Sequence, residues 1–134
     1  MGNVWRPPVL IASVQPNPPA NGVDNGTNGL GSTALAAIGN DQMAMVYLQG
    51  GYANFPDLMY QSVVLQRVDP LGNTSGTPIT IASSAVSPTL IGSVVSTPDV
   101  TTLSNGSVAV SYTFGSYNAG TLRTDVFARI VAPC

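Results

Sequence analysis

The sequence contains no lysine, no glutamate and no histidine, and charged residues make up only 7% of its 134 positions. All of its positive charge comes from arginine and all of its negative charge from aspartate. Without histidine, and with one cysteine, the chain cannot build the usual zinc sites or a Ser-His-Asp triad. The net charge of −2 leaves no basic patch to neutralise phosphates, so nucleic acid is not an expected partner. We expect no catalytic residue, no metal site and no cofactor.

Long apolar runs are also missing. No run approaches the ~18 residues of a transmembrane helix, so we expect no membrane insertion. The start of the chain, MGNVWRPPVLIASV, lacks the basic region and the apolar core of a signal peptide. The single cysteine, Cys134, is the last residue. It excludes an internal disulfide framework, although it could cross-link two chains.

The residues that fill these gaps are glycine, proline, serine, threonine, asparagine and valine, which form turns and strands. The good surface-helix formers lysine and glutamate are absent, so the sequence predicts an all-β fold. A surface solvated by hydroxyl and amide groups protects poorly against association. Because 44% of the residues are hydrophobic, we expect other subunits to cover part of this surface. The alternative is a monomer that buries its apolar residues efficiently.

The clearest local signal is a hairpin over Ser96–Phe114. A short strand from Val100 to Leu103 precedes Asn105-Gly106, and apolar residues then alternate with small and polar ones up to Phe114. Asn-Gly between two such runs predicts a type I′ turn, which needs positive φ at both central residues. The face that carries Val108 and Val110 is expected to lie in the core.

The same pattern occurs earlier in the chain. Residues 38–47 align with residues 103–112 at a constant offset of 65 positions. A third strand follows in each copy, at 60–68 and 125–131, and Arg67 of the first matches Arg129 of the second. A fourth strand is predicted at 77–82.

The N-terminal residues 9–12 resemble this fourth strand and are expected to supply its counterpart in the second copy. The chain is thus expected to be a single all-β domain, 1–134, with two four-stranded units. One unit spans about 33–82, and the other spans 98–133 plus 9–12. The N-terminal strand would close the sheet and remove an open edge. Residues 14–31, rich in proline and Asn-Gly, are expected to form a long loop or assembly arm.

Two parts of the unit carry a family pattern. The first part has Pro98, Val100 and Leu103 before the Asn-Gly turn, and Val108, Val110 and Tyr112 after it. The second part is Gln66-Arg67-Val68-Asp69-Pro70-Leu71-Gly72, followed by Gly76. Together they resemble the repeats, roughly 50 residues long, of large bacterial secreted adhesins and hemolysin-like surface proteins. Tyr112 stands where that family usually has tryptophan.

This resemblance implies a propeller-blade-like unit. Two blades cannot close a propeller, so about three chains would have to associate. The alternative architecture is a self-contained β-sandwich or small barrel within a larger assembly.

Composition assigns residues 49–58 and 115–123 to polar loops, and aromatic and amide side chains there are candidate ligands for a sugar. An aromatic ring can stack on a sugar ring while amides and carboxylates bind its hydroxyl groups. The candidate residues are Tyr52, Asn54, Phe55, Asp57, Tyr117 and Asn118. The competing interpretation is that exposed loop aromatics serve subunit contacts.

Aspartate is the only acidic residue available for acid–base chemistry. A pair of aspartates could in principle hydrolyse a glycosidic bond, but each lies in a turn or strand-end context, where aspartate is common. The run from Asp24 to Gly29 resembles half of a calcium loop, but Leu35 stands where a bidentate acid should close it. A plain loop is the simpler interpretation.

The sequence therefore predicts a non-enzymatic structural protein of an extracellular-surface or virion-type assembly such as a capsid, tail or filament. Its expected partners are further copies of itself or other subunits. The alternative is a lectin-like module that binds glycans after oligomerisation. A hydrolytic β-domain that uses aspartate pairs is a third possibility.

Overall fold

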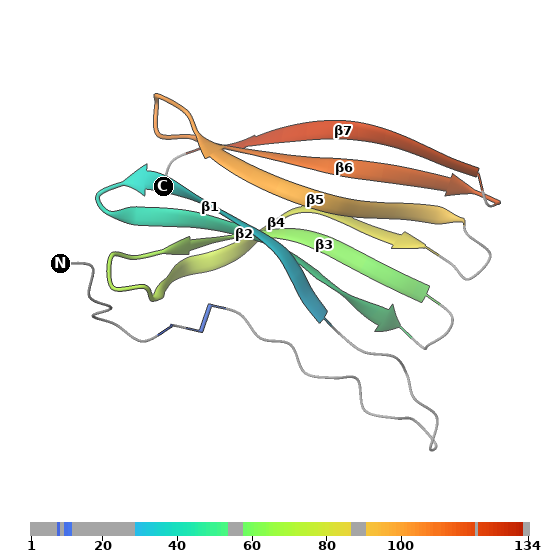
Figure 1. Ribbon diagram of the computed structural model, residues 1–134, viewed down its shortest axis with the longest axis horizontal. Coiled ribbons are helices and arrows are strands. Elements are labelled where there is room, and N and C mark those ends of the chain that lie inside the picture. Colours follow the sequence, from blue (N-terminus) through green and yellow to red (C-terminus); the bar gives the residue numbers. More distant parts are fainter. Residues whose placement is uncertain are drawn as a thin grey trace, which may run out of the picture.

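The computed structural model describes residues 8, 10–11, 29–53, 58–86, 91–119 and 121–132, with the backbone alone at 29, 51–53 and 58–60. Its regular elements are seven antiparallel strands that follow one another in a single sheet, in the order of the sequence (Figure 1). The strands are β1 (Gly29–Gly39), β2 (Gln42–Ala53), β3 (Leu58–Val68), β4 (Thr74–Val86), β5 (Gly92–Thr102), β6 (Val108–Asn118) and β7 (Thr121–Val131). The prediction of an all-β fold is confirmed. Among the described residues, no helix is long and apolar enough to span a membrane.

The sheet folds over on itself between β4 and β5. These two strands share one backbone pair, Val86 with Gly92, and the Ser84 hydroxyl group then accepts a hydrogen bond from the Val95 amide at 2.9 Å. Beyond this corner β5 leaves β4, passes β3 and β2, and ends beside β1. In Figure 1 the layer β5–β7 lies above the layer β1–β4. The sheet therefore forms two layers that are joined at this corner.

The core lies between these layers. The first layer contributes five buried side chains, which pack against buried valines of the second layer. They are Ala44, Val46, Val63, Leu65 and Ile81. Those valines are Val95, Val100, Val108 and Val110. The prediction that Val108 and Val110 face the core is confirmed. β-Branched side chains suit this position because they pack well on a pleated surface.

The hairpins β1–β2 and β5–β6 have the same register when 65 is added to each residue number. Leu35 faces Met45 and Val100 faces Val110; after an irregularity, Gly31 faces Leu48 and Ser96 faces Thr113. The irregularity occupies the same place in both hairpins, since Ser32 and Thr97 each have positive φ, 46° and 51°. The offset found in the sequence is therefore also an offset between strand pairings.

The turns of these two hairpins differ, and one prediction about them is wrong. In the connection between β5 and β6, residues 103–107, only Gly106 has positive φ. Its amide donates a hydrogen bond to the Leu103 carbonyl oxygen at 2.9 Å, so the connection is a longer loop rather than a type I′ turn. The type I′ signature occurs in β1–β2 instead, where Asn40 and Asp41 have φ of 51° and 58°. Asparagine and aspartate tolerate this region better than other non-glycine residues.

The predicted strand bounds were too short. Strand β1 begins at Gly29, inside the expected loop 14–31, and β5 begins at Gly92, well before Val100. Pro98 lies within β5 at the register irregularity, where its missing N–H removes no regular ladder bond. Strands β2, β3, β6 and β7 extend into the segments 49–58 and 115–123 that composition assigned to loops. Residues 14–28 lie outside the described residues.

The prediction of two four-stranded units closed by the N-terminal strand does not hold in this structure. The first layer has four strands and the second has three, and the sheet is open. Leu10 and Ile11 belong to no strand, and the Leu10 side chain is 76% exposed. Val9 and Ala12 lie outside the described residues. Choosing between closure and an open edge requires contacts far apart in the sequence, which local composition does not encode.

Candidate functional site

The most unusual surface in the described part of the chain is the outer edge of β7. This strand pairs with β6 on one side, and no described strand pairs with its other side. Three large apolar side chains on its outer face are exposed: Val126 (75%), Ile130 (56%) and Leu122 (51%). We call these three residues the β7 stripe. Alternate residues of a strand share one face, so the stripe runs the length of β7.

The opposite face of β7 is fixed to the second layer by an aromatic cluster. Phe127 stacks on Tyr112, with ring centroids 5.9 Å apart and planes 23° apart. It also meets Phe114 edge-on, with the same centroid separation and an interplanar angle of 88°. Such pairs add about 0.5–1.5 kcal/mol each beyond the area that they bury. The edge strand is thus held in place although its outer side is unpaired.

Two arginines bind the layers to each other. The Nη1 atom of Arg129 donates to the carbonyl oxygens of Ile81 (2.9 Å) and Thr80 (3.3 Å) in β4. The Nη2 atom of Arg67 donates to the carbonyl oxygen of Ala132 at 3.1 Å. Both guanidinium groups bond backbone oxygens, which is a structural role.

The predicted match between Arg67 and Arg129 is one residue out. Arg67 faces Ala44, whereas Arg129 faces Val110, so the register equivalent of Arg129 is Gln66. Gln66 is buried, and its amide donates to the carbonyl oxygens of Ser75 (3.2 Å) and Gly76 (3.3 Å) in β4. The β6–β7 hairpin is two residues shorter than the β2–β3 hairpin. The offset of 65 that relates β2 to β6 therefore does not hold between β3 and β7.

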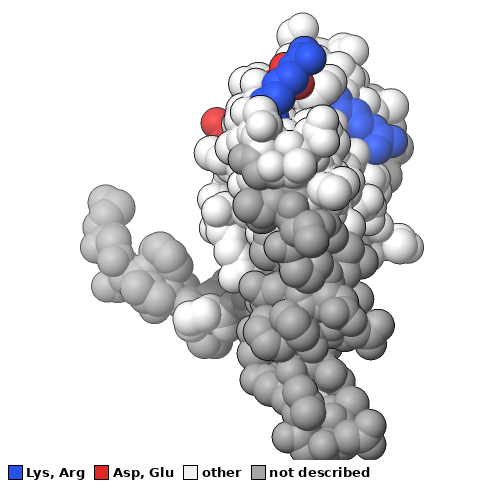
Figure 2. All heavy atoms as spheres, turned by 90° about the vertical axis from the view of Figure 1, so that its right-hand side faces the viewer, with Lys and Arg blue, Asp and Glu red and all other residues white. Residues whose placement is uncertain are grey.

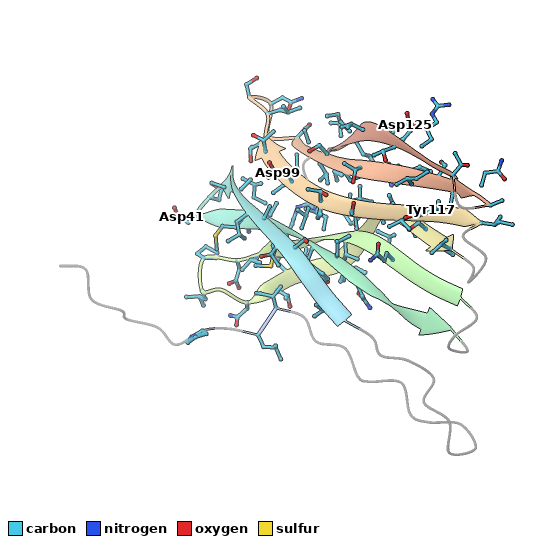
Figure 3. All side chains as sticks on the ribbon, turned by 45° about the vertical axis from the view of Figure 1, so that its right-hand side comes forward. Asp41, Asp99, Tyr117 and Asp125 are labelled. Carbon is cyan, nitrogen blue, oxygen red and sulfur yellow. The ribbon has the colours of Figure 1, made fainter. Side chains whose placement is uncertain are left out.

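The described aspartates serve turns and strand ends. The Asp69 carboxylate accepts hydrogen bonds from the amides of Leu71 and Asn73, both at 2.9 Å, and Asp99 accepts from Val100 at 2.8 Å. Asp125 pairs with Arg123 at 3.3 Å. Figure 3 shows Asp41, Asp99 and Asp125 well apart from one another. Among the described residues, no group of three potential ligands could hold a metal ion.

The residues predicted to bind a sugar are distributed over two hairpins. The backbone of Tyr52 lies near the end of β2, opposite Met59, and its side chain is not described. Tyr117, labelled in Figure 3, lies near the end of β6 and is half-buried, and Asn118 next to it is exposed. Asn54, Phe55 and Asp57 lie outside the described residues. Because only Tyr117 and Asn118 have described side chains, the prediction of a sugar site stays untested.

Two small hollows lie on the described surface. One, of about 110 Å³, lies on the outer face of the second layer beside the irregularity in β5 and reaches β7 at Ala128. The other, of about 150 Å³, lies between the β1–β2 turn and Gly106 of the β5–β6 loop, and Arg67 lines it. Since Ala128 lies between Val126 and Ile130, the first hollow adjoins the β7 stripe.

The charged residues of β7 are unevenly placed: Arg123 and Asp125 lie near its start, and Arg129 lies near its end. Figure 2 shows the end of the molecule that lies on the right in Figure 1; the charged atoms gather at the top, on the side of the layer β5–β7, and the rest of the described surface is mostly uncharged. From Val126 to Val131 the one charged residue is Arg129, whose guanidinium group is bonded to β4. Natural sheets protect their edges with lysine, proline or inward charges. This part of β7 has no lysine and no proline, and its one inward charge, Arg129, is bonded to β4.

Sequence analysis missed this edge, although the signal was present. Leu122, Val126 and Ile130 are four residues apart in the segment TLRTDVFARIV, so they lie on the same face of a strand. That spacing predicts a half-buried strand, and it places the apolar face inward. Only the order of strands in the sheet reveals that this face is turned outward on an edge.

The chain matches no family model, and neither a curated protein nor a solved structure is significantly similar to it.

Proposed function

We propose that the protein is a non-enzymatic structural subunit of an extracellular-surface or virion-type assembly, and that it associates with its neighbours through β7. The observation that carries this proposal is the unpaired edge of β7 with its exposed stripe. An unpaired strand presents a row of backbone N–H and C=O groups that can pair with another chain.

The apolar stripe adds a driving force to that backbone pairing. Burying a large aliphatic side chain stabilises a complex by about 1.5–3 kcal/mol, and the stripe offers three. A protein that remains monomeric rarely leaves such a row on a free edge, because the same surface invites aggregation. A defined partner strand would use this surface and also protect it.

Composition supports the same conclusion. With 7% charged residues and no lysine, the surface has little charge repulsion to keep copies apart. The described aspartates and arginines act on turns, strands and layers, which leaves no described group of them for catalysis. The resemblance to surface adhesins is in keeping with an extracellular location.

The proposal is tested by the mass of the protein in solution, measured by light scattering over the micromolar range. We expect oligomers for the unchanged chain and a shift towards the monomer for Val126→Lys, which places a charge in the stripe. The matched control is Leu71→Lys, which replaces an exposed apolar side chain by the same charge in the β3–β4 turn, away from β7. A chain that stays monomeric throughout the range, or equal effects of the two variants, would overturn the proposal.

A further inference from the structure

Strand β7 lacks a neighbour that its counterpart β3 possesses. Val46 of β2 faces Leu65 of β3, and Ser111, 65 positions later, faces Ala128 of β7. Ala128 is therefore the register equivalent of Leu65, and Phe127 is that of Val64. Strand β3 pairs with β4 on its other side, whereas no described strand occupies that side of β7.

The part of β4 that pairs there has a near copy at the N-terminus. Ile79 faces Leu65 and Thr80 faces Val64, within the run Pro78–Ala82, PITIA. The run Pro8–Ala12 reads PVLIA, with proline, isoleucine and alanine at the same places. A segment that resembles the strand paired with β3 is thus available for the equivalent position beside β7.

Proline at the start of this run is compatible with strand addition. Strand β4 pairs with β5 only at Val86 and Gly92, so its outer side is free along Pro78 and no ladder bond is lost there. A segment added to β7 would likewise be the last strand of its sheet, and Pro8 would face outward. The segment is uncharged, as is the outer face of β7 from Val126 to Ile130.

The described residues of the segment, Pro8, Leu10 and Ile11, belong to no strand in their own chain. The described N-terminal residues, dark blue in Figure 1, lie beneath the layer β1–β4, whereas β7, in red, is at the top. Leu10 is 76% exposed and belongs to no strand. Sixteen residues, 13–28, separate the segment from β1 and can reach up to ~50 Å when extended, which is enough for a neighbouring molecule.

We propose that residues Pro8–Ala12 of one copy pair as an antiparallel strand with β7 of a second copy, with Val9 opposite Ala128 and Leu10 opposite Phe127. This inference rests on the proposed function, since it names the partner of the β7 edge. The donated segment and the accepting edge are different surfaces. Such a contact gives a closed pair where two copies exchange segments reciprocally, and a ring or filament where each copy donates to the next.

The register is tested by disulfide formation between two differently labelled copies, in a Cys134→Ser background. One copy carries Leu10→Cys and the other carries Phe127→Cys. Opposed residues of antiparallel strands come close enough for a disulfide, so we expect a cross-linked pair under mild oxidation. The matched control replaces Phe127→Cys by Ala128→Cys, whose side chain points to the other face, and we expect about tenfold less cross-linking.

Equal cross-linking in both mixtures, or none, would contradict this register. A single chain that carries both Leu10→Cys and Phe127→Cys provides a further check. If it forms only an internal disulfide, the donor is the chain itself and not a second copy.

A mass measurement separates this inference from the proposed function. We expect Leu10→Asp to weaken association about tenfold or more, because it places a charge in the added strand. Leu71→Asp is the matched control, since Leu71 is also exposed but lies in the β3–β4 turn. If the unchanged chain assembles and Leu10→Asp assembles equally well, strand donation fails while assembly through β7 stands. If the unchanged chain is monomeric, both strand donation and assembly through β7 are wrong.

Discussion

The hydroxyl group of Thr102 donates a hydrogen bond to the carbonyl oxygen of Ala37, and these two residues occupy equivalent positions in β5 and β1. Each lies just before its hairpin connection, since Ala37 faces Met43 and Thr102 faces Val108. The two equivalent strands therefore meet directly where the layers cross. Strands β1 and β7 are the two terminal strands of the sheet. The contact covers part of β1, and β7 exposes the longer apolar stripe.

This contact predicts a modest loss of stability for Thr102→Val, which keeps the shape of the side chain and removes the donor. We expect the free energy of unfolding to fall by about 1 kcal/mol, the usual net value of one hydrogen bond. Urea unfolding followed by circular dichroism measures the change. Thr101→Val is the control, because the Thr101 side chain is exposed. Equal losses in both variants would show that the bond to Ala37 contributes nothing.

The corner between β4 and β5 predicts that Gly92 cannot be replaced. Its φ is +136°, and a Cβ atom there would lie 2.2 Å from the carbonyl oxygen of Ala85. We expect Gly92→Ala to destabilise the fold by several kcal/mol, about 3 or more, because both the backbone conformation and the space forbid the methyl group.

Gly76→Ala is the matched control for this corner. Gly76 also has positive φ, +77°, but nothing lies within 4 Å of the added methyl group, so we expect a cost of about 1 kcal/mol. Thermal unfolding of the two variants distinguishes them. A Gly92→Ala variant as stable as Gly76→Ala would mean that β4 and β5 do not meet as described.

The core predicts a large effect at Leu65, whose side chain is 1% exposed and lies among residues of both layers. Leu65→Ala should lower the free energy of unfolding by about 2–5 kcal/mol, since it leaves a cavity between packed sheets. Leu71→Ala removes the same atoms from an exposed turn and should cost less than about 0.5 kcal/mol. Chemical unfolding of both proteins tests the difference, and similar costs would place Leu65 outside the core.

Arg129 should contribute more to stability than Arg123, although both lie on β7. Arg129→Met removes the bonds to the carbonyl oxygens of Thr80 and Ile81 and should cost about 1 kcal/mol. Arg123→Met removes a solvent-exposed pair with Asp125 and should change stability little. Urea titrations decide between them. A larger loss for Arg123→Met would contradict the role of Arg129 in joining the layers.

Burial raises the pKa of Tyr47 above its ordinary value of 10.0. In alkali the unfolded chain therefore loses this proton before the folded chain does, and ionisation favours unfolding. We expect full stability from this group below about pH 10 and a decline as the pH rises towards the folded-state pKa. Tyr47→Phe should flatten that decline. Melting temperatures recorded from about pH 8 to about pH 11 would show an unchanged slope if Tyr47 were not the cause.

Much of the strand structure could be predicted from the sequence. The offset of 65 between Ile38 and Leu103 appeared in the residues before it appeared in the register of the hairpins. The inward face of Val108 and Val110 was equally clear, because alternation with period two specifies a strand face. Strand ends were less predictable. Glycine, asparagine and tyrosine near Tyr117 fit a loop by composition, yet they pair with neighbouring strands in β6.

The sequence by itself determined that this is an all-β chain, where its strands alternate, and that its surface has little charge. These properties depend on side-chain type and local spacing, which act within a few residues. The tertiary structure alone decided that the sheet folds at Val86 and Gly92, that it stays open, and that β7 is its bare edge. Which strand is last in a sheet depends on pairings between distant segments. For that reason the residues of β7 alone do not show that it is the last strand of the sheet.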